Sequence, residues 1–378
     1  MSIILNEDQQ LMVEAMRDLM NSENWDTYFC QCDNEHKFPE RFCVALGELG
    51  LHQMINPPQY GGLEENAMTT FAACWEEVLR LGGNAACIWS STTYPVVLRE
   101  GNEKQIKIAE KLMATNKVLI CNAATEPMAG SDLGAMQTTY TRKGDKYIIN
   151  GQKTFITDAL YSEYMILTAL DAETMTKYTN FFFPCNLPGI KISPLEKLGL
   201  KTNSACEIFL DNVEIGLDDM LGEEGEGFNM QKDDFNIERV ISGLYCYGYA
   251  LCAFEDAAKY ANQRVAFGET IARQPVIQWK LSEMAMKLEN MRNMVFEGSR
   301  RVDEGTLKPG YAAMTKYYCV TAAQEVIDSA IQILGGVGIC GEHRAARAWR
   351  DVRASRISGG TDEMMMRTLG RAIVKAYK

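Results

Sequence analysis

The chain has 378 residues, which predicts two or three domains because a domain typically has roughly 100–200 residues. Acidic residues outnumber basic residues by 50 to 38, and the formal net charge is −12. This balance argues against broad binding to nucleic acid or to an anionic membrane. It leaves open a local site for an anionic ligand, which needs only a few basic groups or backbone N–H groups.

The sequence shows no sign of secretion, of a membrane span or of a metal site. Residues 1–6 lack the basic and then apolar segments of a secretory signal, and no apolar run reaches ~18 residues. The twelve cysteines form no C-x-x-C pair, and the three histidines have no zinc-site spacing to them. We therefore expect a cytoplasmic protein that binds no metal and whose cysteines are mostly buried thiols.

The first third of the chain predicts helices. Asn6 followed by Gln9 is a capping-box pattern. Apolar residues then recur at the spacing of one helical face, at Met12, Met16, Leu19 and Met20. The same periodicity predicts further helices at Phe42–Leu51, Thr69–Leu81 and Glu103–Met113.

The middle of the chain predicts a compact sheet or barrel. Gly144-Asp145 indicates a turn, and Asn150-Gly151 is the strongest hairpin signal in the sequence, between strands at Tyr147–Ile149 and Thr154–Thr157. Further strands are predicted at Thr138–Tyr140, Tyr164–Leu167, Asn180–Phe183, Ile190–Ile192 and Cys206–Ile215.

Long helical patterns return in the last third, at Phe235–Ala261, Pro275–Gly298, Ala312–Leu334 and Glu363–Tyr377. The order helical, β, helical predicts an α+β protein. We expect a helical N-terminal domain over residues 1–118, a β domain over residues 119–230, and a helical C-terminal bundle over residues 231–378.

The segment Ala124–Asp132 reads A-T-E-P-M-A-G-S-D. Its small residues would let a ligand approach the backbone closely, and its hydroxyl groups could form hydrogen bonds to that ligand. The same residues also fit a simple Pro/Gly turn that Ser131-Asp132 would cap.

Five segments together resemble the acyl-CoA dehydrogenase family. They are T-E-P-x-A-G-S-D within Ala124–Asp132, N-G-x-K-x-x-I-T at Asn150–Thr157, R-V-A-F-G at Arg264–Gly268, Q-I-L-G-G-V-G at Gln332–Gly338, and Arg350-Asp351 leading to Gly360-Thr361. Each segment alone is weak, but the five occur in the family's order over nearly the whole chain. The family's three-domain order is also the order predicted above.

The resemblance implies FAD as the cofactor. By position it implies flavin contacts for Ala124, Thr125, Phe155 and Thr157, and contact of Ser131 with both cofactor and thioester. The FAD of a neighbouring subunit would meet Arg264 and Phe267. The pyrophosphate and adenosine end would lie at Gln332, Gly335 and Gly336, with Thr361 and Glu363 nearby. Gly335-Gly336 also fits a helix C-cap, and Pro275 departs from a cofactor-binding pair found in many members.

The family's chemistry needs a carboxylate that handles the proton α to a thioester carbonyl, and hydrogen-bond donors that polarise this carbonyl. Gly359 occupies the position where many members have this glutamate, so the usual base is absent. A minority of members, the isovaleryl type included, place it on a helix just before an arginine, which here corresponds to Glu238 and Arg239. We therefore predict Glu238 as the catalytic carboxylate, with Arg239 and Gly360 at the coenzyme A thioester; an ordinary surface salt bridge is the alternative for Glu238.

Within the family, the chain is most similar to the branch that reduces crotonobetainyl-CoA in bacterial carnitine metabolism, through segments such as Lys197–Leu200, Cys252–Ala258 and Ser358–Met364. A trimethylammonium group is typically held by aromatic faces. Tyr245 and Tyr249 share the helical face of Glu238 and are candidates, although they also fit ordinary core positions. The resemblance further implies an electron-transfer flavoprotein as redox partner and a homotetramer.

Three other functions stay open. One is oxidation of a neutral short-chain or branched-chain acyl-CoA by the same residues. Another is a non-catalytic flavoprotein or CoA-ester binding subunit, which Gly359 favours and Glu238 disfavours. A helical scaffold without cofactor is the weakest, because it gives Ala124–Asp132 and Gln332–Gly338 no purpose.

Overall fold

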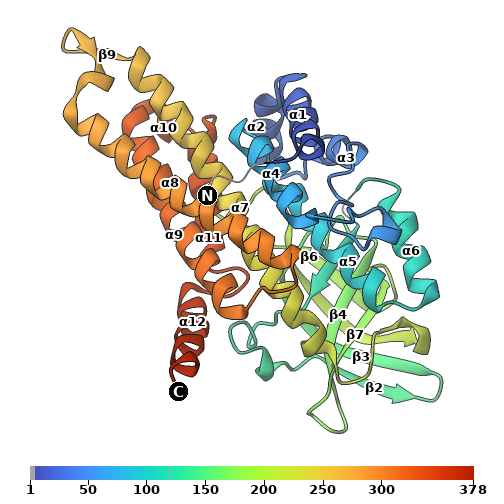
Figure 1. Ribbon diagram of the computed structural model, residues 1–378. Coiled ribbons are helices and arrows are strands. Elements are labelled where there is room, and N and C mark those ends of the chain that lie inside the picture. Colours follow the sequence, from blue (N-terminus) through green and yellow to red (C-terminus); the bar gives the residue numbers. More distant parts are fainter. Residues whose placement is uncertain (1–4, 118) are drawn as a thin grey trace.

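The computed structural model describes residues 5–117 and 119–378; residues 1–4 and residue 118, at the predicted end of the first domain, lie outside the described residues. The elements follow the predicted order of helices, strands and helices. In Figure 1 the N-terminal helices and the sheet lie along one side of a bundle of long C-terminal helices. Among the described residues, no helix has the length and apolar character needed to cross a membrane.

The N-terminal part consists of helices. They are α1 (Glu7–Asn21), α2 (Trp25–Glu35), α3 (Glu40–Glu48), α4 (Ala67–Arg80), α5 (Ser90–Glu100) and α6 (Glu103–Met113). The capping box of α1 is confirmed, because the Gln9 N–H donates to Asn6 Oδ1 (2.8 Å) and the Asn6 N–H donates to Gln9 Oε1 (3.0 Å). The boundaries of α6 are those that the sequence predicts.

The middle part is a mixed sheet. Its strands are β1 (Ile120–Ala123), β2 (Thr139–Lys143), β3 (Lys146–Thr157), β4 (Tyr164–Asp171), β5 (Tyr178–Pro184), β6 (Ile190–Pro194), β7 (Ala205–Gly216) and β8 (Met220–Leu221). They run in the order β6-β7-β3-β2-β4-β5-β8, with β1 beside β4. The β1–β4 and β2–β4 pairs are parallel, and the other pairs are antiparallel. The predicted turn at Gly144-Asp145 is confirmed.

The predicted hairpin at Asn150-Gly151 is wrong, because β3 continues through both residues. The register between β3 and β7 shifts between Ile149 and Gly151, which identifies a β-bulge. The Asn212 N–H of β7 donates to Asn150 Oδ1 (2.8 Å), so the asparagine side chain fills the gap in the ladder. A Cβ on Gly151 would lie 2.4 Å from Thr138 Oγ1, so this glycine permits close approach of two backbones instead of a turn.

The C-terminal part is built on three long helices, α7 (Gly227–Gln263), α8 (Pro275–Asp303) and α9 (Pro309–Leu334). Shorter helices follow at α10 (Gly336–Ile339), α11 (Arg344–Ser355) and α12 (Asp362–Ala376). A small hairpin of β9 (Val265–Ala266) and β10 (Glu269–Thr270) connects α7 to α8, and in Figure 1 it lies at the end of the bundle away from the sheet. All twelve cysteines are free thiols and ten are buried, as expected.

One apolar core joins α1–α4 to α7, α8, α9 and α11, and a separate core lies against the sheet. The ends of helices from the two halves of the chain also meet. Asp303 at the end of α8 accepts hydrogen bonds from the N–H groups of Met68 (2.7 Å) and Thr69 (3.0 Å) and from the Thr69 hydroxyl (2.6 Å). The side chain of Asn66, the N-cap residue of α4, makes no capping hydrogen bond, so Asp303 serves as the cap.

Replacing Asp303 by alanine is expected to lower the free energy of unfolding by about 1–2 kcal/mol, because the first turn of α4 loses its acceptor. Asparagine retains one carbonyl oxygen and should lose less than half as much. Chemical denaturation of the three proteins compares these values. Equal stability of the alanine variant and the unmodified protein would show that water replaces the cap without loss.

Candidate active site

The middle of α7 brings Glu238 to the loop that precedes α12. The Ser242 hydroxyl, one turn after Glu238, donates to the Glu238 carbonyl oxygen (2.8 Å). A Cβ built on Gly359 would lie 4.0 Å from Ser242 Oγ. Because residues four apart share one face of a helix, Glu238 lies on the face of α7 that meets Gly359. The loop therefore brings no side chain toward this face at Gly359.

The surroundings of Glu238 favour its neutral form. Glu238 is half-buried, and burial, together with the nearby Asp234 carboxylate, raises its pKa to about 8, while Arg239 opposes this shift. Arg239 donates to Asn236 Oδ1 (2.8 Å), and its buried Nε has no partner among the described residues. Arg239 therefore has an unused donor beside the carboxyl group, as a residue that binds an anionic or carbonyl ligand would.

A buried ion pair joins the first two sequence motifs. Lys153 Nζ on β3 lies 2.8 Å from Glu126 Oε1, and both side chains are almost completely buried. Lys153 Nζ also donates to the Ala124 carbonyl oxygen (3.2 Å), and the Thr154 N–H donates to the Thr125 carbonyl oxygen (2.9 Å). The pair therefore holds the segment of Ala124 and Thr125 against β3. Glu126 and Lys153 belong to the two motifs, but their pairing was not predicted; a charged residue in each motif was the available signal.

Phe155 has an unusual backbone and an exposed ring. Its φ is +57°, where bulky residues are rare, and it lies at a second bulge of β3, between Lys153 and Ile156. Its side chain is 66% exposed, and Thr157 and Ser131 are exposed as well. A strained backbone that holds an aromatic ring in solvent is typical of a binding site, so this end of β3 suits a flat, largely apolar ligand.

Five of the predicted cofactor residues lie far from Glu238. Arg264 ends α7, about 39 Å along the helix axis from Glu238, and Phe267 in the adjoining hairpin has φ +54° and is fully exposed. The C-terminal end of α9 exposes Gln332, Gly335 and Gly336. This end is about 24 Å along the helix axis from Lys316, which lies close to Gly359. Gly335 is the C-cap of α9, as anticipated.

One chain therefore does not bring all predicted cofactor residues together. Thr361 directly follows Gly360 and is the N-cap of α12, where its hydroxyl accepts a hydrogen bond from the Met364 N–H (3.4 Å). Glu363 lies in the first turn of α12 and is exposed. Arg264 and Phe267 are too distant from Glu238 to contact the same small ligand.

The two tyrosines predicted for the substrate are core residues here. Tyr245 is 1% exposed, stacks edge-to-face with Trp89 (ring centroids 5.8 Å apart), and shares a hydrogen bond with the Ser355 hydroxyl. Tyr249 accepts a hydrogen bond from the Ala85 N–H (2.8 Å) and lies about 16 Å along α7 from Glu238. The structure thus does not bring Tyr249 to the carboxylate, and Trp89 with Tyr245 form the nearer aromatic pair.

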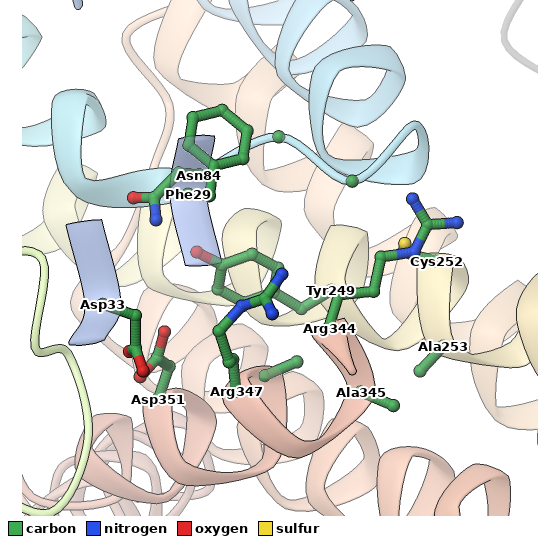
Figure 2. Close-up of a pocket in the computed structure, with 13 residues that line it drawn as sticks. Phe29, Asp33, Asn84, Tyr249, Cys252, Ala253, Arg344, Ala345, Arg347 and Asp351 are labelled. Atoms are coloured by element: carbon green, nitrogen blue, oxygen red, sulfur yellow. The ribbon is translucent and has the colours of Figure 1, made fainter. Parts of the chain in front are cut away.

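Tyr249 instead lines a cavity between α2, α7, α11 and the 82–84 loop (Figure 2). Figure 2 shows the carboxyl groups of Asp33 and Asp351 close together at one end of this cavity. The charged side chains around it have partners: Arg344 binds Asp256, Arg347 binds Asp26, Arg350 binds Asp33, and Asp351 accepts from the Leu200 N–H. This cavity lies between the N-terminal and C-terminal helices, and we do not assign it to the substrate.

Comparison with known proteins decides the family. Three domain models of acyl-CoA dehydrogenases match the chain in succession, the N-terminal domain at residues 6–115, the middle domain at residues 121–213 and the C-terminal domain at residues 225–374. The chain belongs to the acyl-CoA dehydrogenase family. It is accordingly an enzyme of a class of FAD-dependent oxidoreductases that act on a CH–CH group.

Solved structures agree with this assignment to the acyl-CoA dehydrogenases. A glutaryl-CoA dehydrogenase in complex with glutaryl-CoA is 28% identical, with a TM-score of 0.92, over 99% of this chain and 97% of that chain. Butyryl-CoA dehydrogenase from Megasphaera elsdenii is 27% identical, with a TM-score of 0.91, over 99% and 100% of the chains. A chain in a structure of the electron transferring flavoprotein of Acidaminococcus fermentans is 27% identical, with a TM-score of 0.90, over 99% of both chains.

The residues at the end of β3 and in the Ala124–Asp132 segment fit the FAD that acyl-CoA dehydrogenases use. The exposed ring of Phe155 offers a flat apolar face, Thr157 follows it on β3, and Thr125 and Ser131 offer further hydroxyl groups in the segment that is bound to Thr154. A Cβ on Gly335 or Gly336 would meet nothing within 4 Å, so the backbone there is open to close approach. Among the described residues, no cluster of His, Cys, Asp or Glu could hold a metal ion.

Proposed function

We propose that the chain reduces crotonobetainyl-CoA to γ-butyrobetainyl-CoA, with Glu238 as the acid that protonates Cα. The raised pKa of Glu238 supports its role as the proton donor. With a pKa of about 8, the carboxyl group holds its proton at neutral pH. Reduction of an enoyl thioester needs such a proton donor, whereas oxidation of an acyl thioester needs the carboxylate.

The residues of the chain would act together as follows. Bound FAD would supply the hydride for Cβ. Its binding residues in one subunit would be Ala124, Thr125, Ser131, Phe155, Thr157, Gln332, Gly335, Gly336, Thr361 and Glu363. A second subunit would contribute Arg264 and Phe267. Glu238 donates its proton to Cα from α7, and Arg239 and Gly360 bind the thioester. The closed core around α7 limits access of water to this proton.

The aromatic pair supports a cationic substrate. Trp89 is half-buried and Tyr245 is buried behind it. A trimethylammonium group on an indole face gains about 2 kcal/mol when it is desolvated, which corresponds to roughly 30-fold in rate constant. The similarity to a chain in a structure of an electron transferring flavoprotein supports such a protein as the electron donor, and we propose the homotetramer typical of the family.

Reoxidation of the dithionite-reduced protein without oxygen tests the substrate. Crotonobetainyl-CoA is expected to reoxidise it at least about 10-fold faster than crotonyl-CoA or 3-methylcrotonyl-CoA, because only the first has the cation. An equal or faster reaction with a neutral thioester would transfer the assignment to short-chain or branched-chain substrates. A yellow protein that no enoyl thioester reoxidises would favour a non-catalytic flavoprotein.

The raised pKa of Glu238 predicts opposite pH profiles for the two directions. For reduction, kcat/KM should fall as the pH rises through about 8, since Glu238 loses its proton there. For oxidation of γ-butyrobetainyl-CoA with an artificial acceptor, kcat/KM should rise through the same pH. Stopped-flow measurement from pH 6 to pH 10 compares them; profiles that change in the same sense would contradict the role of Glu238.

A further inference from the structure

Lys316 is a buried lysine beneath the loop that faces Glu238. It lies on α9 and is 1% exposed. Burial lowers its pKa to about 8, an effect that Cys246 and Asp362 oppose and Arg239 increases. No carboxylate forms an ion pair with it among the described residues. A buried ammonium group without a counter-ion is costly, so its other partners need an explanation.

Those partners are two carbonyl groups of the loop. Lys316 Nζ donates to the Ser358 carbonyl oxygen (2.5 Å) and to the Gly360 carbonyl oxygen. The two carbonyls flank Gly359, and the intervening backbone has φ +63° at Gly359 and +98° at Gly360. A Cβ on Gly359 would lie 4.0 Å from Lys316 Nζ. The ammonium group therefore fixes a two-glycine loop that would otherwise have many conformations.

The contact also acts on the N–H groups of the same peptides. The Ser358 carbonyl and the Gly359 N–H belong to one peptide group, and the Gly360 carbonyl and the Thr361 N–H belong to another. A cation on a carbonyl oxygen withdraws electron density and makes the N–H of that peptide a stronger donor. Within the described part of the chain, the Gly359 N–H donates to no backbone carbonyl, so it is available to a ligand.

We propose that Lys316 is a positioning residue for the thioester oxygen. It orients and polarises the Gly359 N–H of the loop that lies beside Ser242, one helical turn after Glu238, so that negative charge developing on the carbonyl oxygen is stabilised while Cα exchanges its proton with Glu238. The proposal rests on the proposed chemistry at Cα, and it is independent of the acyl group. Preorganised donors of this kind supply large rate effects when they are aimed at developing charge.

Binding of acetoacetyl-CoA tests the proposal without turnover. This thioester ionises to an enolate with its own ultraviolet absorbance, so the pKa of the bound ligand measures stabilisation of the oxyanion. Lys316→Met is expected to weaken ionisation of the bound ligand by about 10- to 100-fold, or one to two pKa units. Flavin content and thermal midpoint are measured on the same samples.

Lys197 provides a matched control. Its Nζ donates to the carbonyl oxygens of Leu200 (2.6 Å) and Asn203 (2.7 Å), which is the same two-carbonyl arrangement in the loop before β7. Lys197→Met should lose stability and leave the enolate pKa unchanged. Lys316→Gln retains one neutral donor and should show an intermediate enolate pKa, which keeps the test open if the methionine variant does not fold.

The outcomes separate this proposal from the proposed function. A raised enolate pKa in the Lys316 variants alone supports the role of Lys316, even if the preferred substrate proves to be neutral. An enolate pKa that is unchanged in the Lys316 variants, or raised equally in Lys197→Met, overturns it. A ligand that ionises in the unmodified protein as it does in water also overturns it, because the loop is then not an oxyanion site.

Discussion

Glutamine in place of Glu238 is expected to slow reoxidation of the reduced protein by an enoyl-CoA about 10²- to 10⁴-fold, the range for loss of a positioned general acid. The amide has nearly the shape of the protonated carboxyl group and can still donate a hydrogen bond, but it cannot release a proton to Cα. The KM should therefore change much less than kcat. Anaerobic stopped-flow absorbance of the flavin measures both.

Stability provides the first control for this variant. Burial raises the pKa of Glu238 in the folded protein from 4.5 to about 8, so ionisation is less favourable when folded than when unfolded. The unmodified protein should therefore lose stability as the pH rises from about 4.5 to 8, whereas the glutamine variant should not. At pH 8 the variant is expected to be more stable, by at least about 1 kcal/mol.

Relocation of the carboxyl group provides the second control. Gly359→Glu places a carboxylate where many relatives have it, and ordinary contact distances of 3.9–4.0 Å to Lys316 and Ser242 leave room for the Cβ. Combined with Glu238→Gln, it should restore part of the lost rate, limited by strain at φ +63°. Full activity of Glu238→Gln alone would exclude Glu238 as the acid.

Glutamine in place of Glu126 is expected to destabilise the protein by about 3–5 kcal/mol, because the ammonium group of Lys153 stays buried without its counter-ion. Glu126 also accepts from the N–H groups of Gln137 (2.6 Å) and Thr138 (3.0 Å), and an amide can satisfy only part of these contacts. The Thr125 segment should then detach from β3. Flavin content per subunit, measured by absorbance, is expected to fall together with the thermal midpoint.

An exposed pair that also uses a lysine of β3 gives the comparison. Lys146 Nζ lies 2.7 Å from Glu214 Oε2 across β3 and β7, and both side chains are more than half exposed. Glu214→Gln should change stability by less than about 1 kcal/mol, since water screens and solvates the charges. If the two glutamine variants had equal stability, the buried pair would not be what holds the Thr125 segment against β3.

Local patterns predicted the elements well. The capping residues Asn6 and Gln9, the periodicity of Glu103–Met113 and the Gly144-Asp145 turn depend on neighbours within a few residues, and each is present in the structure. The Asn150-Gly151 pair was misinterpreted as a turn. Glycine is needed at position 151 because a Cβ there would clash with Thr138 on the adjacent segment. A single sequence does not reveal which distant backbone approaches a glycine.

The candidate site was predictable only in part for the same reason. Glu238 was predicted from its position in a motif and from the absence of a carboxylate at Gly359. Both features can be identified from the sequence alone. Lys316 gave no such signal, since its role comes from a loop more than forty residues later. Tyr249 shared a helical face with Glu238 in the sequence, yet eleven residues of helix separate the two side chains into different surroundings.

If each centre takes its acid from one subunit and its Phe267 hairpin from another, as we propose, the distance between Glu238 on α7 and Phe267 in the β9–β10 hairpin has a genetic consequence. Two genes that encode the same chain, one defective at Glu238 and the other at Phe267, would each yield inactive assemblies, because every centre would contain a damaged component. When both chains are expressed in one cell and assemble at random, some centres would combine the intact acid of one chain with the intact hairpin of the other. The two alleles would therefore complement each other. The recovered activity would be proportional to the fraction of centres formed between unlike subunits.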